Sequence, residues 1–172
     1  MAVYALGDRV PQIDPSAFVH PDATIIGSVE IGPESSIWPH AVLRGDSSRI
    51  VIGARTSIQD GAVLHCTHEL ETVVGDDCVI GHLVHLEGCT VESGSLVGSG
   101  SIVLHRAVVR SGALVGAAAL VPNGVEVPSR AMALGVPAVI KPDRVDPETI
   151  KFQAAGYVHN GRYHASKLRR LD

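Results

Sequence analysis

The sequence predicts an all-β chain, a parallel β-helix of six-residue units that is followed by one C-terminal α-helix. Three observations lead to this fold. Aliphatic residues recur every six positions over most of the chain, and a small residue follows many of them four positions later. Near the end, the pattern changes to a helix start at Asp146-Pro147-Glu148. A period of six fits neither a helix nor a simple alternating strand, but it is typical of a solenoid of short strands.

Each six-residue unit is expected to form one short strand and one turn, and three units close one triangular coil. The aliphatic residue points inward, and successive coils stack at about 4.8 Å, the spacing of neighbouring strands. The run of units corresponds to seven coils. The predicted inward residues are Ile13, Val19, Ile25, Ile31, Ile37, Leu43, Ile52, Ile58, Leu64, Val74, Ile80, Leu86, Val91, Val97, Val103, Val109, Val115, Val121, Val127, Ala133 and Val139.

The corners of the coils are predicted from two kinds of residue. Small side chains such as Ala23 and Ala41 stand four positions after an inward residue, where they fit a tight corner. Glycine often follows the inward residue directly, as at Gly32, Gly53 and Gly81. Because glycine has no Cβ atom, we expect these positions to adopt backbone angles that other residues avoid.

The six-residue period breaks in three places. Three residues are extra within 43–52, four are extra within 64–74, and one is missing within 86–91. Breaks in a solenoid repeat map to loops, and loops carry binding and catalytic residues more often than the scaffold does. All three breaks lie beside polar side chains, so we expect the functional site in the middle of the chain.

The chain changes character after the repeats. Residues 1–140 are predicted to form the β-helix, and residues 141–172 a linker and a helix that packs on it. Asp146 is a suitable N-cap and Pro147 suits the first turn, so the helix is expected over about 147–170.

Composition limits the possible functions. The chain has 172 residues, the length of one domain, and a formal charge of −4 without a basic patch, which argues against nucleic acid. No apolar run is long enough for a membrane span, and the N-terminus does not have the pattern of a signal peptide. The cysteines Cys66, Cys78 and Cys89 are odd in number and irregularly spaced, which favours reduced thiols in the cytoplasm.

Polar residues fall into two columns when the coils are stacked in register. One column, after three inward leucines, contains Arg44, His65 and Glu87. The other, on the preceding side of the prism, contains Gln59, Asp60 and His82. Two columns on different sides do not easily meet within one chain, but they can meet when three prisms pack around a threefold axis. The sequence therefore predicts a homotrimer whose site is shared between chains.

The two columns together contain the donors of a metal site. Two imidazoles and a carboxylate, from His65, His82 and Glu87, are typical of Zn²⁺ with an open position for water. Fe or Co also suit these ligands. Bound zinc lowers the pKa of water to about 7, which supplies hydroxide at neutral pH. Gln59 could orient that hydroxide or a substrate oxygen.

Four short runs resemble those of the gamma-class carbonic anhydrase family. They are RGD at 44–46, SIQDGAVLHCTH at 57–68, GH at 81–82 and EGCT at 87–90. Together with the repeats and the closing helix, the resemblance covers nearly the whole chain. The six-residue pattern alone is shared with many acyltransferases, whereas these runs in this order are much more specific.

The resemblance implies a left-handed β-helix trimer with a metal site between subunits. It also implies an enzyme, a lyase that reversibly hydrates CO₂ to bicarbonate, whereas the composition gives no reason to expect a nucleic-acid or membrane partner. Carried over to this sequence, His65 of one chain and His82 of its neighbour are metal ligands.

The resemblance also assigns supporting roles. It implies that Gln59 contacts hydroxide or bicarbonate. It also implies that Asp60 accepts a hydrogen bond near the metal ligands without binding the metal itself. It implies that Arg44 and Asp46 form an ion pair between subunits that orders the interface. Tyr157 resembles a C-terminal tyrosine of the family that can face the pocket.

The chain departs from the family at the third ligand. The family motif usually reads GHxxxLHG, whereas residues 81–88 read GHLVHLEG, so Glu87 occupies the place of a histidine. His85 is the alternative residue for completing the metal shell. A carboxylate donates more charge than an imidazole, so hydration is expected to be weak or absent at neutral pH. His68 stands where some members carry an acidic proton shuttle.

Three functions compete on this evidence. The first is the metal-dependent hydratase. The second is an acyltransferase that uses acyl-CoA and a histidine base, and the third is a non-catalytic trimer that binds a small ligand or a metal. Metal content separates the first from the second, and activity with metal present separates the first from the third.

Overall fold

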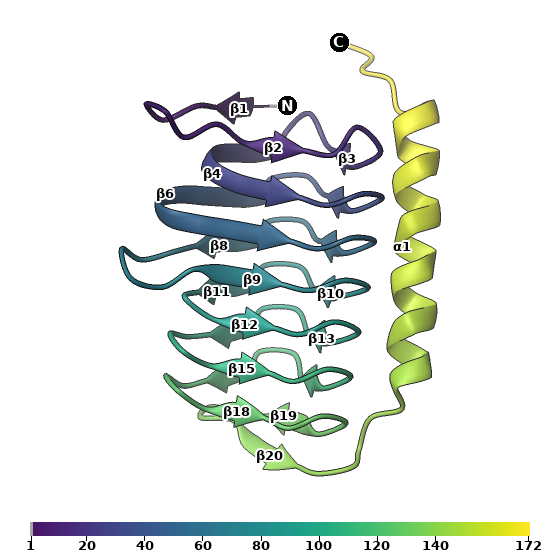
Figure 1. Cartoon of the computed structure of the whole chain (residues 1–172). Helices are drawn as coiled ribbons and strands as arrows, with labels where there is room; N and C mark the ends of the chain where they lie inside the picture. Colours follow the sequence, from purple (N-terminus) through teal and green to yellow (C-terminus); the bar gives the residue numbers. More distant parts are fainter. Residues whose placement is uncertain (1) are drawn as a thin grey trace.

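The computed structural model describes residues 2–172 and confirms the predicted left-handed β-helix with one C-terminal helix (Figure 1). Short strands stack into a three-sided prism, and the helix α1, Pro147–Lys167, runs along its length (Figure 1). Seven strands of the third face, β3 to β19, pair in parallel, one from each coil. The seven coils predicted from the period are therefore present.

The strands alternate among three faces in chain order. The first face contains β1 (Ala2–Tyr4), the first parts of β4 (Thr24–Ile31) and β6 (Val42–Ile52), β8 (Val63–His65), β11 (His85–Glu87), β14 (Ile102–Val103) and β17 (Leu120–Val121). The second contains β2 (Gln12–Ile13), the later parts of β4 and β6, β9 (Thr72–Val74), β12 (Thr90–Val91), β15 (Val108–Val109) and β18 (Glu126–Val127). The third contains β3 (Phe18–Val19), β5 (Ser36–Ile37), β7 (Ser57–Ile58), β10 (Val79–Ile80), β13 (Leu96–Val97), β16 (Leu114–Val115), β19 (Met132–Leu134) and β20 (Val139–Lys141).

The predicted inward residues form the core. From Ile25 to Val127 each of them is at most 3% exposed, and the small corner residues such as Ala41 are fully buried. The last predicted inward residue, Val139, is wrong: it is 63% exposed. The chain reverses there, because β20 pairs antiparallel with β19 and closes the end of the prism. The period therefore ends with the coil that contains Ala133.

The glycines after the inward residues have a different role from the expected one. Gly32, Gly53 and Gly81 do not adopt the left-handed conformation. They allow close stacking, since a Cβ atom on Gly32 would lie 2.7 Å from the carbonyl carbon of Gly53 in the next coil. The left-handed residue stands just before the small corner residue, as at His40 (φ 61°) and Gly61 (φ 68°).

The breaks in the period appear where the sequence places them. Between β4 and β6, Gly27 pairs with Gly45 and Val29 with Ile50, so β6 bulges outward by three residues at the corner. The four extra residues belong to the loop between β8 and β9. The missing residue leaves a tight corner at Gly88, where φ is +59° and a Cβ atom would lie 3.0 Å from the Cβ of Leu70.

The C-terminal helix begins as predicted and ends earlier. The Asp146 side chain caps it by accepting a hydrogen bond from the backbone N–H of Glu148 at 3.1 Å, and the last helical residue is Lys167. Its buried residues are Ile150, Ala154 and Gly161, and the helix packs against β3, β5, β7 and β10 of the third face. The helix approaches the strands closely at Gly161, where an added Cβ atom would lie 3.4 Å from the Cβ of Ser36.

Candidate functional site

The first polar column lies on the first face, where β6, β8 and β11 run side by side. The parallel register pairs Arg44 with His65, and His65 with Glu87, as the spacing of the inward leucines predicts. Successive side chains of a strand point to opposite faces, so a residue that follows an inward leucine points outward. The column is therefore an outward-facing row of polar side chains.

His65 lies between two carboxylates. Its Nδ1 is 2.7 Å from Oε1 of Glu87, and its Nε2 is 2.9 Å from Oδ1 of Asp46. Asp46 also forms an ion pair with Arg44, so the pair that the resemblance placed between subunits exists within one chain. Asp46 belongs to the extra residues of β6, and the bulge is what carries its carboxylate to the imidazole. Each nitrogen of the imidazole therefore faces a carboxylate oxygen.

Glu87 is surrounded by three histidines. Besides the bond from His65, its Oε2 lies 3.5 Å from Nε2 of His85 and 3.4 Å from Nε2 of His105. The Nε2 atom of His105 is buried and has no hydrogen-bond partner within residues 2–172. The hydrogen bond from His65 holds the pKa of Glu87 below its ordinary value, against the opposing effect of burial.

Asp46 is also held in its ionised form. Burial acts to raise its pKa, but the hydrogen bonds from His65 and Arg44, together with their charges, outweigh that effect and lower it. Two ionised carboxylates and a cation therefore surround His65. The two carboxylates favour a positively charged ion beside the imidazole.

Asp60 and His82, two members of the second column, lie in the turns after β7 and β10. Oδ2 of Asp60 lies 2.9 Å from Nδ1 of His82, and the two side chains are about half exposed, at 47% and 53%. A histidine that donates from Nδ1 to a carboxylate keeps a lone pair on Nε2. His82 is therefore oriented to bind a metal or to accept a proton through Nε2.

One chain does not assemble the predicted ligand set. Across residues 2–172, no three His, Cys, Asp or Glu side chains are grouped so as to hold a metal ion. His65 is bonded to Asp46 and Glu87, whereas His82 is bonded to Asp60. The two columns are separate in the single chain, as their places on different sides of the prism predict.

Gln59, Asp60 and Tyr157 are brought together at another place, a pocket of about 300 Å³ between the third face and α1. Aromatic rings form part of its wall. The ring of Trp38 lies 6.3 Å from that of Tyr157 and 5.0 Å from that of His164, centroid to centroid. Because Asp60 also bonds His82, this pocket borders the second column.

Sequence reasoning did not select Trp38 or His164. Trp38 is the single tryptophan of a chain with 3% aromatic residues, and that rarity is a signal that could have identified it. His164 has no such signal, because its place in the pocket depends on how α1 packs on the coils. The contact of His65 with Asp46 was also missed, since the repeat does not determine the course of an insertion.

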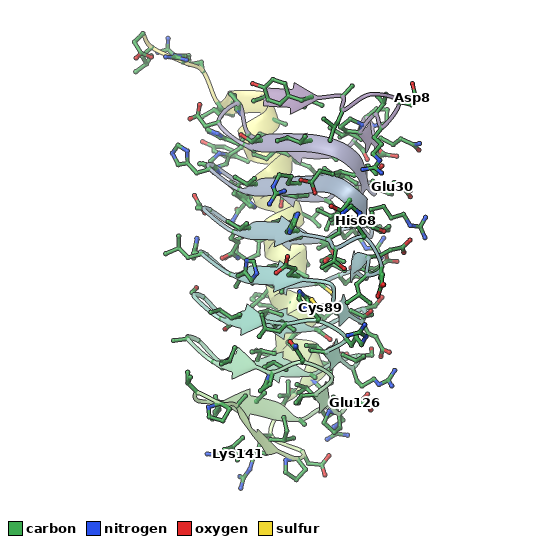
Figure 2. All side chains as sticks on the ribbon, turned by 90° about the vertical axis from the view of Figure 1, so that its left-hand side faces the viewer. Asp8, Glu30, His68, Cys89, Glu126 and Lys141 are labelled. Atoms are coloured by element: carbon green, nitrogen blue, oxygen red, sulfur yellow. The ribbon has the colours of Figure 1, made fainter. Side chains whose placement is uncertain are left out.

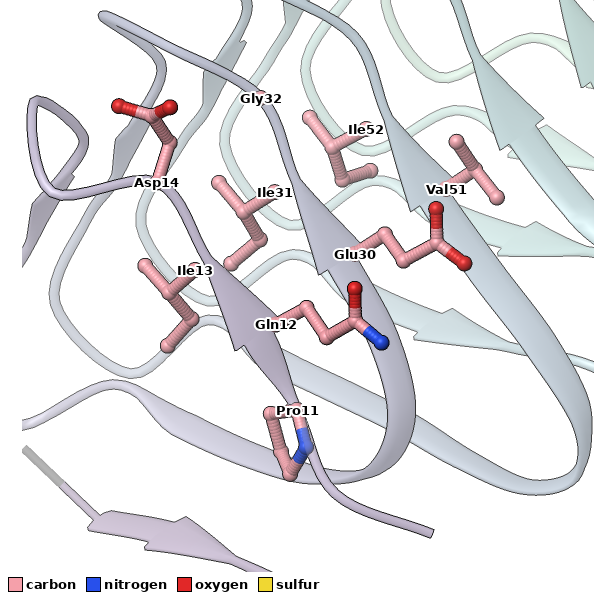
Figure 3. Close-up of a pocket in the computed structure, with 9 residues that line it drawn as sticks. All are labelled: Pro11, Gln12, Ile13, Asp14, Glu30, Ile31, Gly32, Val51 and Ile52. Atoms are coloured by element: carbon pink, nitrogen blue, oxygen red, sulfur yellow. The ribbon is translucent and has the colours of Figure 1, made fainter.

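Other polar features lie apart from these residues. A shallow groove of about 600 Å³ on the second face is bordered by Gln12, Asp14 and Glu30, and by none of the predicted site residues (Figure 3). His68 is exposed on the loop after β8 and lies toward the same edge of the prism as Glu30 (Figure 2). Neither feature contacts the two columns.

The three cysteines are structural. Cys66, Cys78 and Cys89 are free and buried, and Cys89 lies at a corner of the coils (Figure 2). Burial raises the pKa of Cys78 and of Cys89 to about 12, so these thiols stay protonated at neutral pH. A protonated thiol is a poor metal ligand. Cys66 accepts a hydrogen bond from the backbone N–H of Ser48 at 3.2 Å, inside the bulged corner.

Two named relatives match most of the chain. It is 37% identical over 168 residues to the mitochondrial protein "Gamma carbonic anhydrase 2" of Arabidopsis thaliana, an alignment that covers 93% of this chain and 60% of the plant protein. It is 38% identical over 138 residues to the carnitine operon protein CaiE of Escherichia coli O157:H7, which covers 80% of this chain and 70% of CaiE. The chain thus spans less than two thirds of the plant relative. No protein-family model matches it.

Two solved structures have nearly the same fold. A Bacillus cereus protein described as an acetyltransferase superposes with a TM-score of 0.94 at 36% identity, covering 96% of this chain and 97% of that one. A hexapeptide transferase family protein from Anaplasma phagocytophilum superposes with a TM-score of 0.90 at 35% identity, covering 95% and 98%. Within residues 2–172, no helix has the length and apolar character that crossing a bilayer requires.

Proposed function

The chain belongs to the gamma carbonic anhydrase-like family of hexapeptide-repeat proteins, and on this premise we propose that it is a metal-dependent enzyme for the reversible hydration of CO₂. In this proposal three chains pack around a threefold axis, and His65 and Glu87 of one chain meet His82 of its neighbour. The observation that carries it is that each imidazole has a carboxylate that can stay bonded to one ring nitrogen while the other nitrogen binds a metal. Asp46 lies 2.9 Å from Nε2 of His65, and Asp60 lies 2.9 Å from Nδ1 of His82.

The donor set suits Zn²⁺, with Fe or Co as further candidates, because imidazole nitrogens and a carboxylate oxygen are its usual ligands. Metal-binding histidines usually donate their other ring N–H to a carboxylate, which fixes the tautomer. His82 has this arrangement through Asp60. His65 has a carboxylate on each nitrogen, so it can bind a metal only after Asp46 or Glu87 moves away.

We assign the movement to Glu87, which stands at the third-ligand position of the family motif. Released from Nδ1 of His65, its carboxylate can join His65 and His82 around the metal. Asp46 and Arg44 stay paired and hold the corner of the interface. Metal analysis of the Glu87→Gln variant tests this assignment, with Glu92→Gln on the second face as the matched control. Loss of metal only in Glu87→Gln supports it, and retention of metal in both variants contradicts it.

The remaining residues act on the substrate. A bound metal of this kind supplies hydroxide near neutral pH, because it lowers the pKa of water to about 7. The Gln59 amide holds an oxygen of CO₂ or bicarbonate, Asp60 keeps His82 in one tautomer, and Tyr157 contributes a hydroxyl to the same pocket. The negative charge of Glu87 weakens the metal as a Lewis acid. Hydration is therefore expected to be weak at neutral pH and to increase on the alkaline side.

Metal analysis together with a CO₂ hydration assay tests this function. The parent protein is expected to contain metal and to hydrate CO₂ slowly at neutral pH, and Glu87→His to be faster there at equal metal occupancy. A parent that is fully active at neutral pH, with Glu87→His no better, refutes the role given to Glu87. Metal without hydration in both proteins favours a trimer that binds metal but is not an enzyme.

Mixed oligomers test the sharing of the site. His65→Ala and His82→Ala chains each lack one ligand, so each alone is expected to lose metal. When the two are mixed and reassembled, some interfaces regain both imidazoles, and metal binding should return in part. A mixture that never regains metal, or a parent that sediments as a monomer, rules out a site between chains.

Acyl transfer is the second candidate. A histidine whose Nδ1 is bonded to a carboxylate is a suitable general base, and the His82–Asp60 pair has this geometry. The Bacillus cereus structure is described as an acetyltransferase, which also favours this reading. Acetyl-CoA and a panel of amines, offered to metal-free protein, separate the two functions. Turnover that requires His82 but no metal supports acyl transfer over hydration.

A further inference from the structure

We propose that the pocket between α1 and the third face binds a neutral primary carboxamide carried on an aromatic ring. The inference goes beyond CO₂ hydration and does not depend on a bound metal. Its main observation is Gln59, whose side chain is only 3% exposed and borders the pocket. Within residues 2–172, the amide of Gln59 makes no hydrogen bond with another group.

An amide without a protein partner in the wall of a pocket points to a ligand. Its nitrogen and oxygen are not sealed inside the protein, since the buried side-chain atom without a partner within residues 2–172 is Nε2 of His105. They are therefore open to a group that enters the pocket, and native structures complete most such polar groups with a ligand or an ordered water. The Gln59 side chain offers one carbonyl acceptor and one NH₂ donor in the same plane. Another primary carboxamide is the matching group, because it presents one donor and one acceptor with the same spacing.

The charge of the pocket favours a neutral ligand. Asp60 is the acidic residue among those that line it, and no Lys or Arg is among the described lining residues. Within residues 2–172, only Oδ2 of Asp60 is bonded, to His82, so Oδ1 remains as an acceptor for an N–H of the ligand. A carboxylate ligand would meet this negative charge without a Lys or Arg to compensate it, and it could not donate to either acceptor.

Aromatic rings in fixed positions favour a flat ligand body. Nε1 of Trp38 donates to the hydroxyls of Ser36 and Ser57, at 3.0 Å each, so the indole cannot rotate freely. Tyr157 and His164, two turns apart on the same side of α1, pack edge-on against the indole, with ring centroids 6.3 Å and 5.0 Å from it. Flat molecules pack well on rings of this kind, by stacking or by edge-to-face contact.

The size of the pocket also separates this ligand from CO₂. A volume of about 300 Å³ is at the lower end of small-molecule sites, which run from about 300 to 1,000 Å³. A water molecule takes about 30 Å³ in the liquid, so the pocket has room for about ten. CO₂ has three heavy atoms and would leave most of that space unfilled, whereas a molecule such as benzamide occupies much of it.

Titration with benzamide, followed by tryptophan fluorescence and calorimetry, tests the proposal. The chain has one tryptophan, Trp38, so the optical signal comes from the wall of the pocket. Metal-free parent protein is expected to show saturable binding of benzamide, and binding of benzoate at least about tenfold weaker. Gln59→Leu, which keeps the volume but removes the amide, should weaken benzamide binding by at least about tenfold.

Two further variants complete the experiment. Gln12→Leu removes an amide from the groove on the second face and should leave benzamide binding unchanged. Tyr157→Leu removes a ring that α1 contributes to the pocket, so it should weaken benzamide binding severalfold while leaving the core of the β-helix unchanged. If Gln59→Leu does not fold, the loss of binding in Tyr157→Leu and the ratio of benzamide to benzoate affinity in the parent test the proposal instead. Equal binding of the two ligands, no saturable binding, or equal losses in Gln59→Leu and Gln12→Leu would overturn the proposal.

Discussion

Two stretches of the same prism differ in regularity and in chemistry. In 43–91, called here the interrupted coils, the period breaks three times, and the surface carries the bonded group of Asp46, His65 and Glu87. In 91–133, the regular coils, the period is unbroken, and Arg110 bridges Glu92 and Glu126 in an exposed ladder. The regular repeat builds a rigid scaffold, and its interruptions turn side chains toward one another. Asp46 reaches His65 only because β6 bulges.

The two stretches also differ inside. The inward residues of the interrupted coils are mostly Ile and Leu, whereas those of the regular coils from Val97 to Val127 are all Val. Leu86 and Val103 are stacked neighbours across this change, and both are fully buried. The larger inward side chains therefore lie under the polar group, where Leu64 and Leu86 directly precede His65 and Glu87.

The largest expected effect tests that support. Leu86→Ala should lower the free energy of unfolding by about 2–5 kcal/mol, because it removes a buried side chain and leaves a cavity. Val103→Ala, its stacked control, removes two carbon atoms where Leu86→Ala removes three, so it should cost roughly two thirds as much. Urea unfolding of both variants measures the difference. Equal losses of unfolding free energy would mean that the larger Leu86 side chain stabilises its coil no more than Val103 stabilises the next one.

The second effect compares two left-handed corners. Gly88, in the interrupted coils, has φ +59° and would place a Cβ atom 3.0 Å from Leu70, whereas Gly94 has φ +72° and open space. Gly94→Ala should cost about 1–2 kcal/mol for the conformation alone. Gly88→Ala should cost roughly 1 kcal/mol more, since Leu70 must move as well. Urea midpoints that fall equally would show that the crowding at Gly88 is relieved without cost.

Much of this architecture follows from the sequence. The spacing of six predicts the inward residues from Ile25 to Val127, because one buried position per strand is a condition that every coil must meet. The same spacing fails at Val139, where β20 turns back and the condition no longer applies. Pairings such as Arg44 with His65 follow from the register alone. The predicted backbone angles of Gly32, Gly53 and Gly81 were wrong. Glycine is required both where coils approach closely and where the chain makes a left-handed turn, so its presence alone does not separate the two causes.

The rest of the site depends on elements that the repeat does not place. The contact of Asp46 with His65 depends on the path of a bulge, and no period describes that path. The pocket around Gln59 depends on how α1 packs, which brings Trp38 and Tyr157 together from distant parts of the chain. Sequence columns therefore predict which residues share a face, but not which of them bond to one another.

The smallest effect concerns the exposed ladder of the regular coils. Hydrogen bonds from Arg110 hold the pKa of Glu92, and that of Glu126, below the ordinary value of 4.5. A carboxyl whose pKa is lower in the folded chain than in the unfolded chain stabilises the fold above the unfolded pKa. That contribution is lost as the pH falls through the folded value. Arg110→Ala should therefore destabilise the chain slightly at neutral pH and by less in acid, and exposed pairs of this kind contribute little.

Urea midpoints of parent and Arg110→Ala, taken between pH 7 and about pH 3, measure this effect. The two curves should be separate at neutral pH and converge as the glutamates become protonated. Arg106→Ala is the matched control, since Arg106 is more exposed and lies 3.9 Å from its partner Glu69. It should show no convergence of this kind. A gap for Arg110→Ala that stays constant down to pH 3 would mean that its aliphatic stem, and not its charge, stabilises the ladder. The regular coils would then stabilise the fold through packing alone. Any pH dependence of stability from ionised carboxylates would come from the interrupted coils.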